Sequence, residues 1–455
     1  MEKYDVIVIG SGSGMVVIEE ALAHEKKVAL VDKGPTGGTC LNTGCIPSKM
    51  LICAADRIIE AQEAKKLGVA AEIKNIDFKF IMERMRSTIK GYHDRMLNGL
   101  SDVDGLTFYN GEAQFIKDYT LEVNSKTITG KNICIASGSR ISIPPIKGLD
   151  DITYLTNESV LQLKEKPESI IIIGGGYIAV EYSHFFSAMG TKVTVLEMAN
   201  RLILNEEPTV SELLKKKLSQ RMEVHTNALV EEVKKKNGKC IVTAKDANTG
   251  IQREFAAQKV LVAVGRRSNA DLLKPEKTSV QTDSRGYIRV NEYMETSQKN
   301  IYAVGDANGQ QMFTHVANRE AGVAANNILH DTKDKMNYSA APHAVYSHPQ
   351  IASVGLTEEN AKKDHTILVG TAEYSSIAKG EAMMEEETFA KAIVDKETEK
   401  ILGFHIIGPN APELIQEVVD TMESGGTMSN IMSGIHIHPA LSELVQQALA
   451  NLVEI

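Results

Sequence analysis

The chain has 455 residues, 43% of them apolar, and a formal net charge of -9. This length allows two or three domains, because a single hydrophobic core stops growing near about 250 to 300 residues. The acidic balance gives no electrostatic reason for binding nucleic acid or an acidic membrane. Five cysteines do not make a secreted disulfide framework, and the apolar run Val6–Ile9 is too short for a signal peptide. We expect a soluble cytoplasmic protein.

A strand, a glycine turn and a helix are predicted at the start of the chain. Tyr4–Ile9 is almost continuously apolar, as in a parallel strand buried on both faces, and the helix after the turn is expected to end near Ala23. The glycines of the turn are Gly10, Gly12 and Gly14. Met15 occupies the third small position of the G-x-G-x-x-G pattern, so the helix must approach the strand closely by another route.

The next predicted strand, Lys27–Val31, ends at Asp32, twenty positions after Gly12. A carboxylate at this place could accept hydrogen bonds from a ribose. The N-terminus of the preceding helix would then face a pyrophosphate. One such unit alone leaves an ordinary turn as an equal alternative.

Two cysteines, Cys40 and Cys45, follow this first unit five positions apart. On a regular helix, residues five apart are separated by about 8.7 Å between Cα atoms, whereas a disulfide needs roughly 4.4 to 6.8 Å. The pair can therefore bridge only where the helix is bent or unwound, which Gly44 and Pro47 permit. The segment predicts a reducible pair, with two unrelated buried thiols as the alternative. The other cysteines, expected to be packing residues, are Cys53, Cys134 and Cys240.

The strand, turn and helix pattern recurs in the middle of the chain. Ser169–Ile173 is apolar, and the predicted strand Lys192–Leu196 ends at Glu197, 21 positions after the second glycine of the turn. The small residues of this turn are Gly174, Gly176 and Ala179. A carboxylate at Glu197 suits a free 2'-hydroxyl and repels a 2'-phosphate, so NAD is favoured over NADP, while Arg201 keeps NADP open. Two complete units favour nucleotide binding over coincidence.

Two such units and the Cys-x4-Cys segment resemble the flavoprotein pyridine nucleotide-disulfide oxidoreductases, the family of dihydrolipoamide dehydrogenase, glutathione reductase, mycothione reductase and mercuric reductase. The resemblance covers essentially the whole chain. Further segments that match in order are Ile135–Ser139, Val262–Arg267, Ile301–Ala307, Pro342–Pro349 and Ile351–Glu358. The family implies an α/β fold, with two Rossmann-like, three-layer dinucleotide-binding domains and a C-terminal α+β dimerisation domain.

The resemblance also implies domain boundaries and partners. Residues 1–145 and 271–335 would form a discontinuous FAD-binding domain, which an NAD(P)-binding domain at 146–270 interrupts. Residues 336–455 would form the dimerisation domain of a homodimer. The expected ligands are FAD and NAD, with NADP possible, and the expected substrate is a small dithiol or disulfide.

Cofactor contacts follow residue by residue from the resemblance. Asp306 would bind the flavin ribitol, and His315 would lie beside the flavin at the start of a helix. The positions expected to contact FAD are Gly10, Gly12, Gly14, Asp32, Lys33, Gly38, Thr39, Lys49, Gly138, Gly305, Asp306, Thr314, His315 and Ala317. The positions expected to contact NAD are Gly174, Gly176, Tyr177, Ala179, Glu181, Glu197 and Gly265.

The two sulfurs receive different roles from the resemblance. Cys40 would be the exchange thiol that forms a mixed disulfide with the substrate, and Cys45 would be the thiolate that faces the flavin. Lys49, one helical turn after Cys45, would stabilise negative charge near the flavin, and Glu181 would be its carboxylate partner. For Lys49 and Glu181 the alternative is surface solvation, the usual fate of these residue types.

The exchange thiol needs a base, because only the thiolate attacks. Pro439 predicts the first turn of a helix running through Leu452, with His438 at its mouth and Glu443 in the next turn. Glu443 could fix the tautomer of the imidazole. A histidine near a helix start is more often structural, but the resemblance implies that His438 and Glu443 act on Cys40 of the other subunit. His436 is the competing candidate.

Oxidation of dihydrolipoamide by NAD is the leading function. Glu197 and the segment Gly408–Glu417 favour it, and a 2-oxo acid dehydrogenase complex is then a possible partner. Three other segments look more like mycothione reductase, so an NAD(P)H-dependent reductase of another low-molecular-weight disulfide is the alternative. These segments are Gly12–Met15, Tyr374–Met383 and Ile437–Leu441.

Other functions are less favoured by the sequence. Mercuric reductase normally carries a C-terminal cysteine pair, and no cysteine follows Cys240. A metal centre is disfavoured because there is no paired C-x2-C arrangement, and His436-x-His438 lacks an obvious third ligand. A non-catalytic flavin redox sensor that retains the fold is the minor alternative.

Overall fold

The computed structural model describes residues 2–101, 103–330 and 333–455. As far as it is described, the chain divides into two compact units, each made of segments distant in sequence. Unit 1 comprises Met1–Ser48, Glu83–Ser142 and Gly265–Asn337, and unit 2 comprises Lys49–Met82, Ile143–Val264 and Tyr338–Ile455. None of the described helices is long and apolar enough to cross a membrane.

Unit 1 is built on a seven-stranded sheet in the order β3-β2-β1-β6-β5-β4, with β16 also paired to β6. Its strands are β1 Glu2–Ile9, β2 Val28–Asp32, β3 Leu106–Asn110, β4 Ala113–Lys117, β5 Thr120–Val123, β6 Lys126–Ile135 and β16 Ile301–Ala303. Strands β3, β2, β1, β6 and β16 run parallel, and β5 pairs antiparallel with both β6 and β4. Ile7, Ile133 and Phe115 are buried in its core, as the apolar runs predict.

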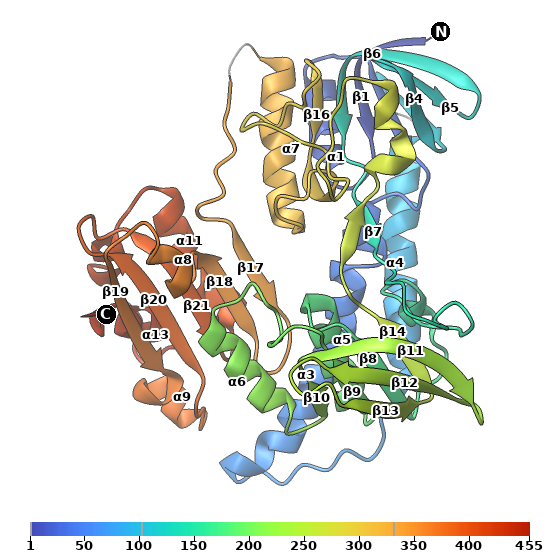
Figure 1. Ribbon diagram of the computed structural model, residues 1–455. Coiled ribbons are helices and arrows are strands. Elements are labelled where there is room, and N and C mark those ends of the chain that lie inside the picture. The colour runs from blue at the N-terminus through green and yellow to red at the C-terminus, as the bar shows by residue number, and fades with distance from the viewer. Residues whose placement is uncertain (1, 102, 331–332) are drawn as a thin grey trace. The chain divides into compact units, whose positions relative to one another are not determined.

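Helix α1 Gly14–Ala23 packs on this sheet, and α7 Thr314–Leu329 lies beside α1 (Figure 1). A Cβ atom added to Gly14 would lie 2.7 Å from Val8 Cγ1 and 3.1 Å from Ala136 Cβ. The close approach of helix to strand that Met15 cannot provide is therefore made by Gly14. Unit 1 also contains α4 Phe78–Leu100 from Glu83 onward, and the short antiparallel pair β7 Ser139–Ile141 and β15 Arg266–Ser268.

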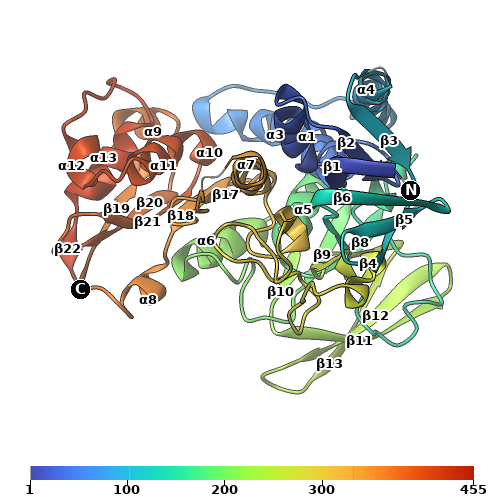
Figure 2. The same cartoon turned by 90° about the horizontal axis from the view of Figure 1, so that it is seen from above.

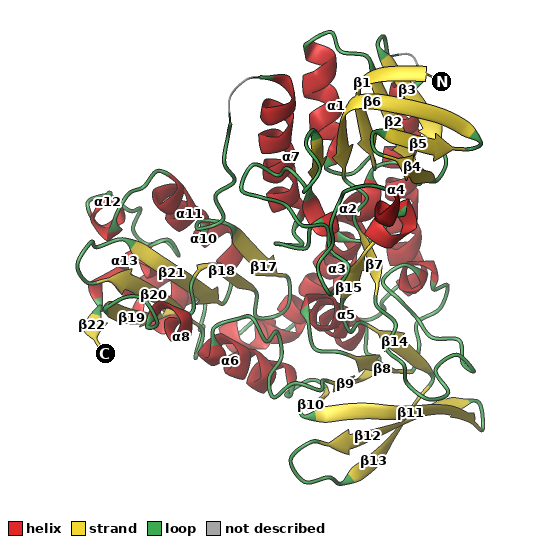
Figure 3. Cartoon of the chain, turned by 45° about the horizontal axis from the view of Figure 1, so that its top comes forward, coloured by secondary structure: helices red, strands yellow, loops and turns green. Residues whose placement is uncertain are grey.

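The middle of unit 2 has three layers. Its central sheet is parallel, in the order β10-β9-β8-β14, with β8 Ser169–Ile173, β9 Lys192–Leu196, β10 Glu223–His225 and β14 Lys259–Val262. Helix α5 Tyr177–Ala188 packs on it, and the fully buried Ala179 permits that contact. Figure 3 shows the second, three-stranded sheet as arrows, namely β11 Ala228–Lys236, β12 Lys239–Asp246 and β13 Gln252–Ala257. Helix α6 Pro208–Leu218 follows β9 in the chain.

The C-terminal part of unit 2 is a six-stranded antiparallel sheet in the order β17-β18-β21-β20-β19-β22. Its strands are β17 Pro342–Val345, β18 Ile351–Gly355, β19 Ile367–Glu373, β20 Phe389–Asp395, β21 Ile401–Ile407 and β22 Val453–Glu454. Helices α11, α12 and α13 cover one face of it (Figure 2), and Phe404 and Leu444 are buried between sheet and helices. The helices here are α8 Glu358–Ala361, α9 Ala378–Ala382, α10 Ala411–Leu414, α11 Gln416–Glu423, α12 Met428–Met432 and α13 Glu443–Ala450.

The last helix departs from the sequence-based prediction. It begins at Glu443 instead of at Pro439 and ends at Ala450. The Glu443 carboxylate accepts the N–H of Ala440 at 2.9 Å, so it stabilises a turn ahead of the helix. Glu443 is therefore in the first turn of the helix, where a carboxylate also interacts favourably with the helix dipole.

A matched pair of helix glycines tests the close packing of α1. We expect Gly14→Ala to lower the free energy of unfolding by about 1 to 3 kcal/mol, because the new methyl overlaps Val8. Gly91→Ala, in α4, should raise it by up to about 1 kcal/mol, since alanine favours helix and its Cβ meets only Arg95 Nη1 at 3.6 Å. Denaturant unfolding followed by circular dichroism measures both. Equal stability of the two variants would contradict the packing role of Gly14.

Candidate active site

The two cysteines lie on different helices. Cys40 belongs to α2 Gly38–Asn42 and Cys45 begins α3 Cys45–Glu63, so the helix is interrupted at Thr43 and Gly44, as the cysteine spacing requires. A Cβ atom on Gly44 would lie 3.0 Å from Thr39 O, which explains why a small residue stands at the break. The interruption brings the two side chains into hydrogen-bond contact.

Cys40 is half-buried, and Cys45 is exposed in the single chain. The hydrogen bond from Cys45, burial and the negative charge on Cys45 together raise the pKa of Cys40 well above its usual range. The Cys45 sulfur also lies 3.4 Å from Thr314 Oγ1, at the first residue of α7. In the reduced pair, the Cys40 thiol therefore keeps its proton after Cys45 has lost its own. Attack by Cys40 on a disulfide would need a base to remove that proton.

The first glycine turn forms a backbone cradle. A Cβ atom on Gly38 would lie 2.9 Å from Gly12 Cα, so Gly38 has no room for a larger residue and its backbone approaches Gly12 closely. The Asp32 carboxylate accepts the N–H groups of Ser11 and Gly34, each at 2.7 Å, and so holds the turn in shape. Lys33 is exposed and pairs with a glutamate. An open glycine edge beside an oriented carboxylate fits the pyrophosphate and ribose of FAD.

Asp306 lies in a polar cluster at the same edge of the sheet, because β1 and β16 both pair in parallel with β6 and end beside Ile135. Its carboxylate accepts the hydroxyl of Ser139, and Arg266 Nε lies 3.5 Å from it. Arg266 also donates from Nε to Ser139 Oγ at 2.7 Å. The buried Glu320 of α7 accepts the N–H of Gly305 at 2.6 Å and thereby fixes the turn that carries Asp306. These partners orient the carboxylate that was expected to bind ribitol.

Other predicted flavin residues lie close to this turn or to the start of α7. A Cβ atom on Gly305 would lie 3.0 Å from Ala317 Cβ, so these two positions pack together. His315 is exposed on the first turn of α7, with its ring stacked on Phe313 at 5.8 Å. Gly138 has a φ of 66°, a conformation that favours glycine.

The second glycine turn, in unit 2, repeats the geometry of the first. A Cβ atom on Gly174 would lie 2.3 Å from Ala263 O, whereas Gly176 and Gly265 face open space. Tyr177 follows as the first residue of α5. The Glu197 carboxylate accepts the N–H of Ala199 at 2.6 Å, and a Cβ atom on Gly175 would lie 2.8 Å from Glu197 Cγ, so the Glu197 side chain lies against the turn.

Lys49 and Glu181 form an ion pair in unit 2. Lys49 Nζ lies 2.7 Å and 2.8 Å from the two carboxylate oxygens of Glu181, and only 9% of the Glu181 side chain is exposed. The N–H of Tyr346 donates to Glu181 at 3.2 Å, and the Tyr346 ring lies 4.5 Å from Lys49 Nζ. The two residues are therefore not solvated surface charges, which was the alternative.

His438 and Glu443 also meet within unit 2. His438 Nδ1 lies 2.8 Å from a Glu443 carboxylate oxygen, and the imidazole is otherwise exposed. The N–H of Ala440 and the hydrogen bond from His438 lower the pKa of Glu443. When Nδ1 carries the hydrogen, Nε2 is left as the proton acceptor. His436 differs, because it is mostly buried against Glu417, with 2.9 Å between Nε2 and the carboxylate.

The structure also shows what the sequence reasoning missed. Cys53 was expected to pack in the core and is exposed on α3, whereas Cys134 and Cys240 are buried as expected. Ser139, Arg266 and Tyr346 lie within segments already singled out but received no role. The role of Glu320 could have been predicted from one feature of the sequence. An acidic residue at this position interrupts the apolar face of α7 formed by Val316, Ala317 and Val323.

Comparison with known families covers most of the chain. A family model described as pyridine nucleotide-disulphide oxidoreductase matches residues 4–321. A second model, the dimerisation domain of the same family, matches residues 341–449. The two matches agree with the parallel sheets of both units and with the C-terminal antiparallel sheet.

Known relatives align over most of their length. Dihydrolipoyl dehydrogenase of Geobacillus stearothermophilus is 38% identical over 98% of this chain and 95% of its own. Mycothione reductase of Mycobacterium tuberculosis is 34% identical over 99% and 100%. Mercuric reductase of Staphylococcus aureus is 32% identical over 97% and 81%.

Among solved structures, the Cu(II) complex of the HOCl-induced flavoprotein disulfide reductase RclA from Escherichia coli superposes with a TM-score of 0.88. Its sequence is 27% identical, and the match covers 99% of this chain and 99% of RclA. Fold, paired cysteines and sequence similarity agree. The chain is a member of the pyridine nucleotide-disulfide oxidoreductase family, whose fold is α/β with a C-terminal dimerisation domain.

Proposed function

We propose that the protein is an FAD-dependent dithiol/disulfide oxidoreductase that uses NAD and oxidises dihydrolipoamide. The observation that carries this proposal is the hydrogen bond between Cys40 and Cys45, which lie on either side of the break between α2 and α3. The Lys49–Glu181 ion pair and the His438–Glu443 pair supply the remaining polar groups that such a reaction needs. The 38% identity to a dihydrolipoyl dehydrogenase supports this substrate.

The proposed thiol–disulfide exchange takes place at the cysteine pair in its disulfide form. A substrate thiolate attacks Cys40 Sγ, the Cys40–Cys45 bond breaks, and Cys45 leaves as a thiolate. The second substrate thiolate attacks the substrate sulfur bound to Cys40, which releases lipoamide and the Cys40 thiolate. The two electrons gained by the pair then pass to NAD. The sum is dihydrolipoamide plus NAD⁺ giving lipoamide, NADH and a proton.

His438 is the base that this exchange requires. It accepts the proton of the attacking thiol at Nε2, while Glu443 holds Nδ1 and stabilises the imidazolium. The match to the family's dimerisation domain supports a homodimer. In the proposal His438 of one copy serves Cys40 of the other copy.

FAD has suitable groups in unit 1. The cradle of Gly12 and Gly38 would take the pyrophosphate, Asp32 the ribose, and Asp306 the ribitol. When bound, FAD would carry two electrons between the cysteine pair and the nicotinamide. Lys49 would hold positive charge beside it.

NAD is the proposed nucleotide rather than NADP. The Glu197 side chain lies against Gly175 of the second glycine turn, where its carboxylate would accept a ribose hydroxyl and repel a 2'-phosphate. Arg201 donates from Nη2 to Leu204 O at 2.9 Å, so one of its donors is engaged by the backbone.

Reduction of another low-molecular-weight disulfide by NAD(P)H is the second candidate. The 34% identity to mycothione reductase over 99% of the chain favours it, together with the segments noted above. The same groups would serve this reaction in the reverse direction.

Substrate assays separate the two candidates. We expect rapid formation of NADH from dihydrolipoamide and NAD, and slow reaction with NADP, because Glu197 repels the extra phosphate. The comparison uses several low-molecular-weight disulfides with NADH or NADPH, followed at 340 nm. Faster turnover of one of those disulfides would refute the lipoamide assignment. Absence of any turnover by an FAD-loaded dimer would favour a redox sensor.

Cysteine variants test the division of roles between the sulfurs. Cys40→Ser should abolish turnover yet keep a long-wavelength absorption band, because the Cys45 thiolate remains beside the flavin. Cys45→Ser should lose both turnover and band. Cys53→Ser, on the exposed side of α3, is the matched control and should behave as wild type. A strong band in Cys45→Ser would reverse the two assignments.

Variants of the histidine pair test the base. His438→Gln should lower kcat by about 10²- to 10⁴-fold, and Glu443→Gln should lower it less, because the imidazole stays in place. Since the pKa of Glu443 is lowered, this group stays ionised near neutral pH. His24→Gln, at a site in unit 1, is the control, and a wild-type kcat for His438→Gln would exclude the base role.

A further inference from the structure

Helix α3 carries a polar stripe, by which we mean Lys49, Asp56 and Glu63. These residues are seven positions apart, so they lie on one face of the helix, each about 10.5 Å from the next. Each contacts a polar side chain of unit 2. The three contacts are Lys49 with Glu181, Asp56 with His184, and Glu63 with His348.

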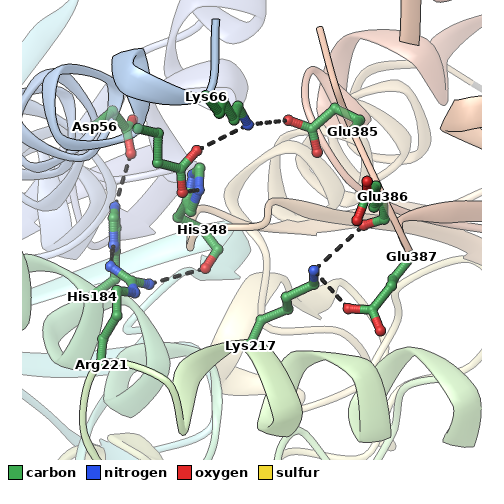
Figure 4. Close-up of polar contacts among 10 residues, drawn as sticks. Asp56, Lys66, His184, Lys217, Arg221, His348, Glu385, Glu386 and Glu387 are labelled. Atoms are coloured by element: carbon green, nitrogen blue, oxygen red, sulfur yellow. Dashed lines mark hydrogen bonds and ion pairs between the residues drawn. The ribbon is translucent and has the colours of Figure 1, made fainter. Parts of the chain in front are cut away.

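The middle contact is the most enclosed (Figure 4). The His184 side chain is fully buried in α5, and its Nε2 lies 2.8 Å from Asp56 Oδ1. On the other side of the ring, Nδ1 lies 3.2 Å from Arg221 Nη1. A guanidinium can only donate, so Nδ1 must accept and Nε2 must carry the hydrogen that Asp56 accepts. The geometry therefore selects a neutral imidazole, and burial lowers the pKa of His184 in the same sense.

The outer contact shares the same arginine. Arg221 Nη2 donates to the backbone oxygen of His348 at 3.0 Å, and the His348 ring stacks on His184 at 6.3 Å. His348 Nε2 lies 3.0 Å from Glu63, and this hydrogen bond lowers the pKa of Glu63 to about 2. Lys66 continues the network from Glu63 to Glu385, and Figure 4 shows its contact with Glu385.

The contact at Lys49 depends on the same pair of helices. Glu181 and His184 are three residues apart on α5, so one turn of α5 contacts two residues of the stripe, Lys49 and Asp56. Apolar packing is non-directional and would allow α3 to slide along α5. Two hydrogen-bonded contacts, separated by two turns of α3, instead define one position of α3 along α5. Loss of the His184 contact would leave the buried side of Asp56 without its donor.

We propose that His184 is a positioning residue for the redox reaction, held between Asp56 and Arg221 so that it sets the place of α3 along α5 and with it the place of the Lys49 ammonium. This role rests on the proposed function, which puts Lys49 beside the flavin. His184 touches neither substrate nor cofactor and acts through α3.

Two substitutions at His184 separate the hydrogen bonds from the volume of the ring. His184→Gln retains one donor for Asp56 and one acceptor for Arg221, whereas His184→Leu retains neither. In the FAD-loaded enzyme, we expect His184→Leu to slow anaerobic reduction by NADH between about 10- and 100-fold, as small misplacements do. Its long-wavelength absorption band should weaken at unchanged KM for NADH. His184→Gln should keep most of the rate and of the band.

Hydrogen exchange tests the positioning without reference to turnover. The amides of Lys49–Glu63 should exchange faster in His184→Leu than in wild type, and His184→Gln should restore protection. The matched control is His365→Leu, which removes another histidine–aspartate pair of unit 2, His365 with Asp395 at 2.7 Å. This control should leave exchange in α3 unchanged.

Acid provides a third readout. Protonated His184 would face Arg221 donor to donor, with Asp56 and His348 as the other groups around the ring. Because the folded-state pKa is lowered, the unfolded chain takes up the proton first and stability falls as pH drops below about 6.5. His184→Gln should remove this part of the pH dependence.

The outcomes are distinct. A folded, FAD-loaded His184→Leu protein with wild-type reduction rate, band and exchange in α3 would overturn the positioning role. Absence of NADH-dependent reduction in the wild type would overturn the proposed function instead, and unchanged α3 exchange would still decide against His184.

Discussion

The interruption of the helix at Thr43 and Gly44 is the constraint on which the candidate site depends. A continuous helix would hold the sulfurs of Cys40 and Cys45 too far apart to bond. The break brings them into contact, and that contact raises the pKa of Cys40 in the reduced pair. It also makes Cys45 the first residue of α3, so the positions of Lys49 and of the polar stripe follow from it.

The two nucleotide-binding turns are built by one repeated contact. The backbone of the first glycine in each turn lies in close contact with a carbonyl oxygen just after a neighbouring strand. A Cβ atom would lie 2.2 Å from Ala136 O at Gly10 and 2.3 Å from Ala263 O at Gly174. This explains why the segments Ile135–Ser139 and Val262–Arg267 recur together with the glycine motifs. Each is the surface on which a glycine turn rests.

Carboxylates orient the site before any ligand binds. Asp32 and Glu197 accept N–H groups of their own turns, Glu181 holds Lys49, and Glu320 holds the turn before Asp306. Fixed acceptors of this kind reduce the ordering that binding would otherwise require. The stripe on α3 extends the same principle from the cysteine helix to the nucleotide-binding helix, through the neutral ring of His184.

The sequence by itself determined the features whose partners are near in the chain. These are the strand, turn and helix units, the break between the cysteines, and the His438–Glu443 pair five residues apart. It misjudged the start of the last helix and the exposure of Cys53, because capping contacts and burial depend on neighbours that periodicity does not reveal. Only the tertiary structure brought Ser139 and Arg266 to Asp306, Tyr346 to Lys49, and Asp56 to His184. Arg266 lies 40 positions from Asp306, and the other partners are separated by more than 100 positions. Their meeting depends on how whole helices and sheets pack, which no local pattern encodes.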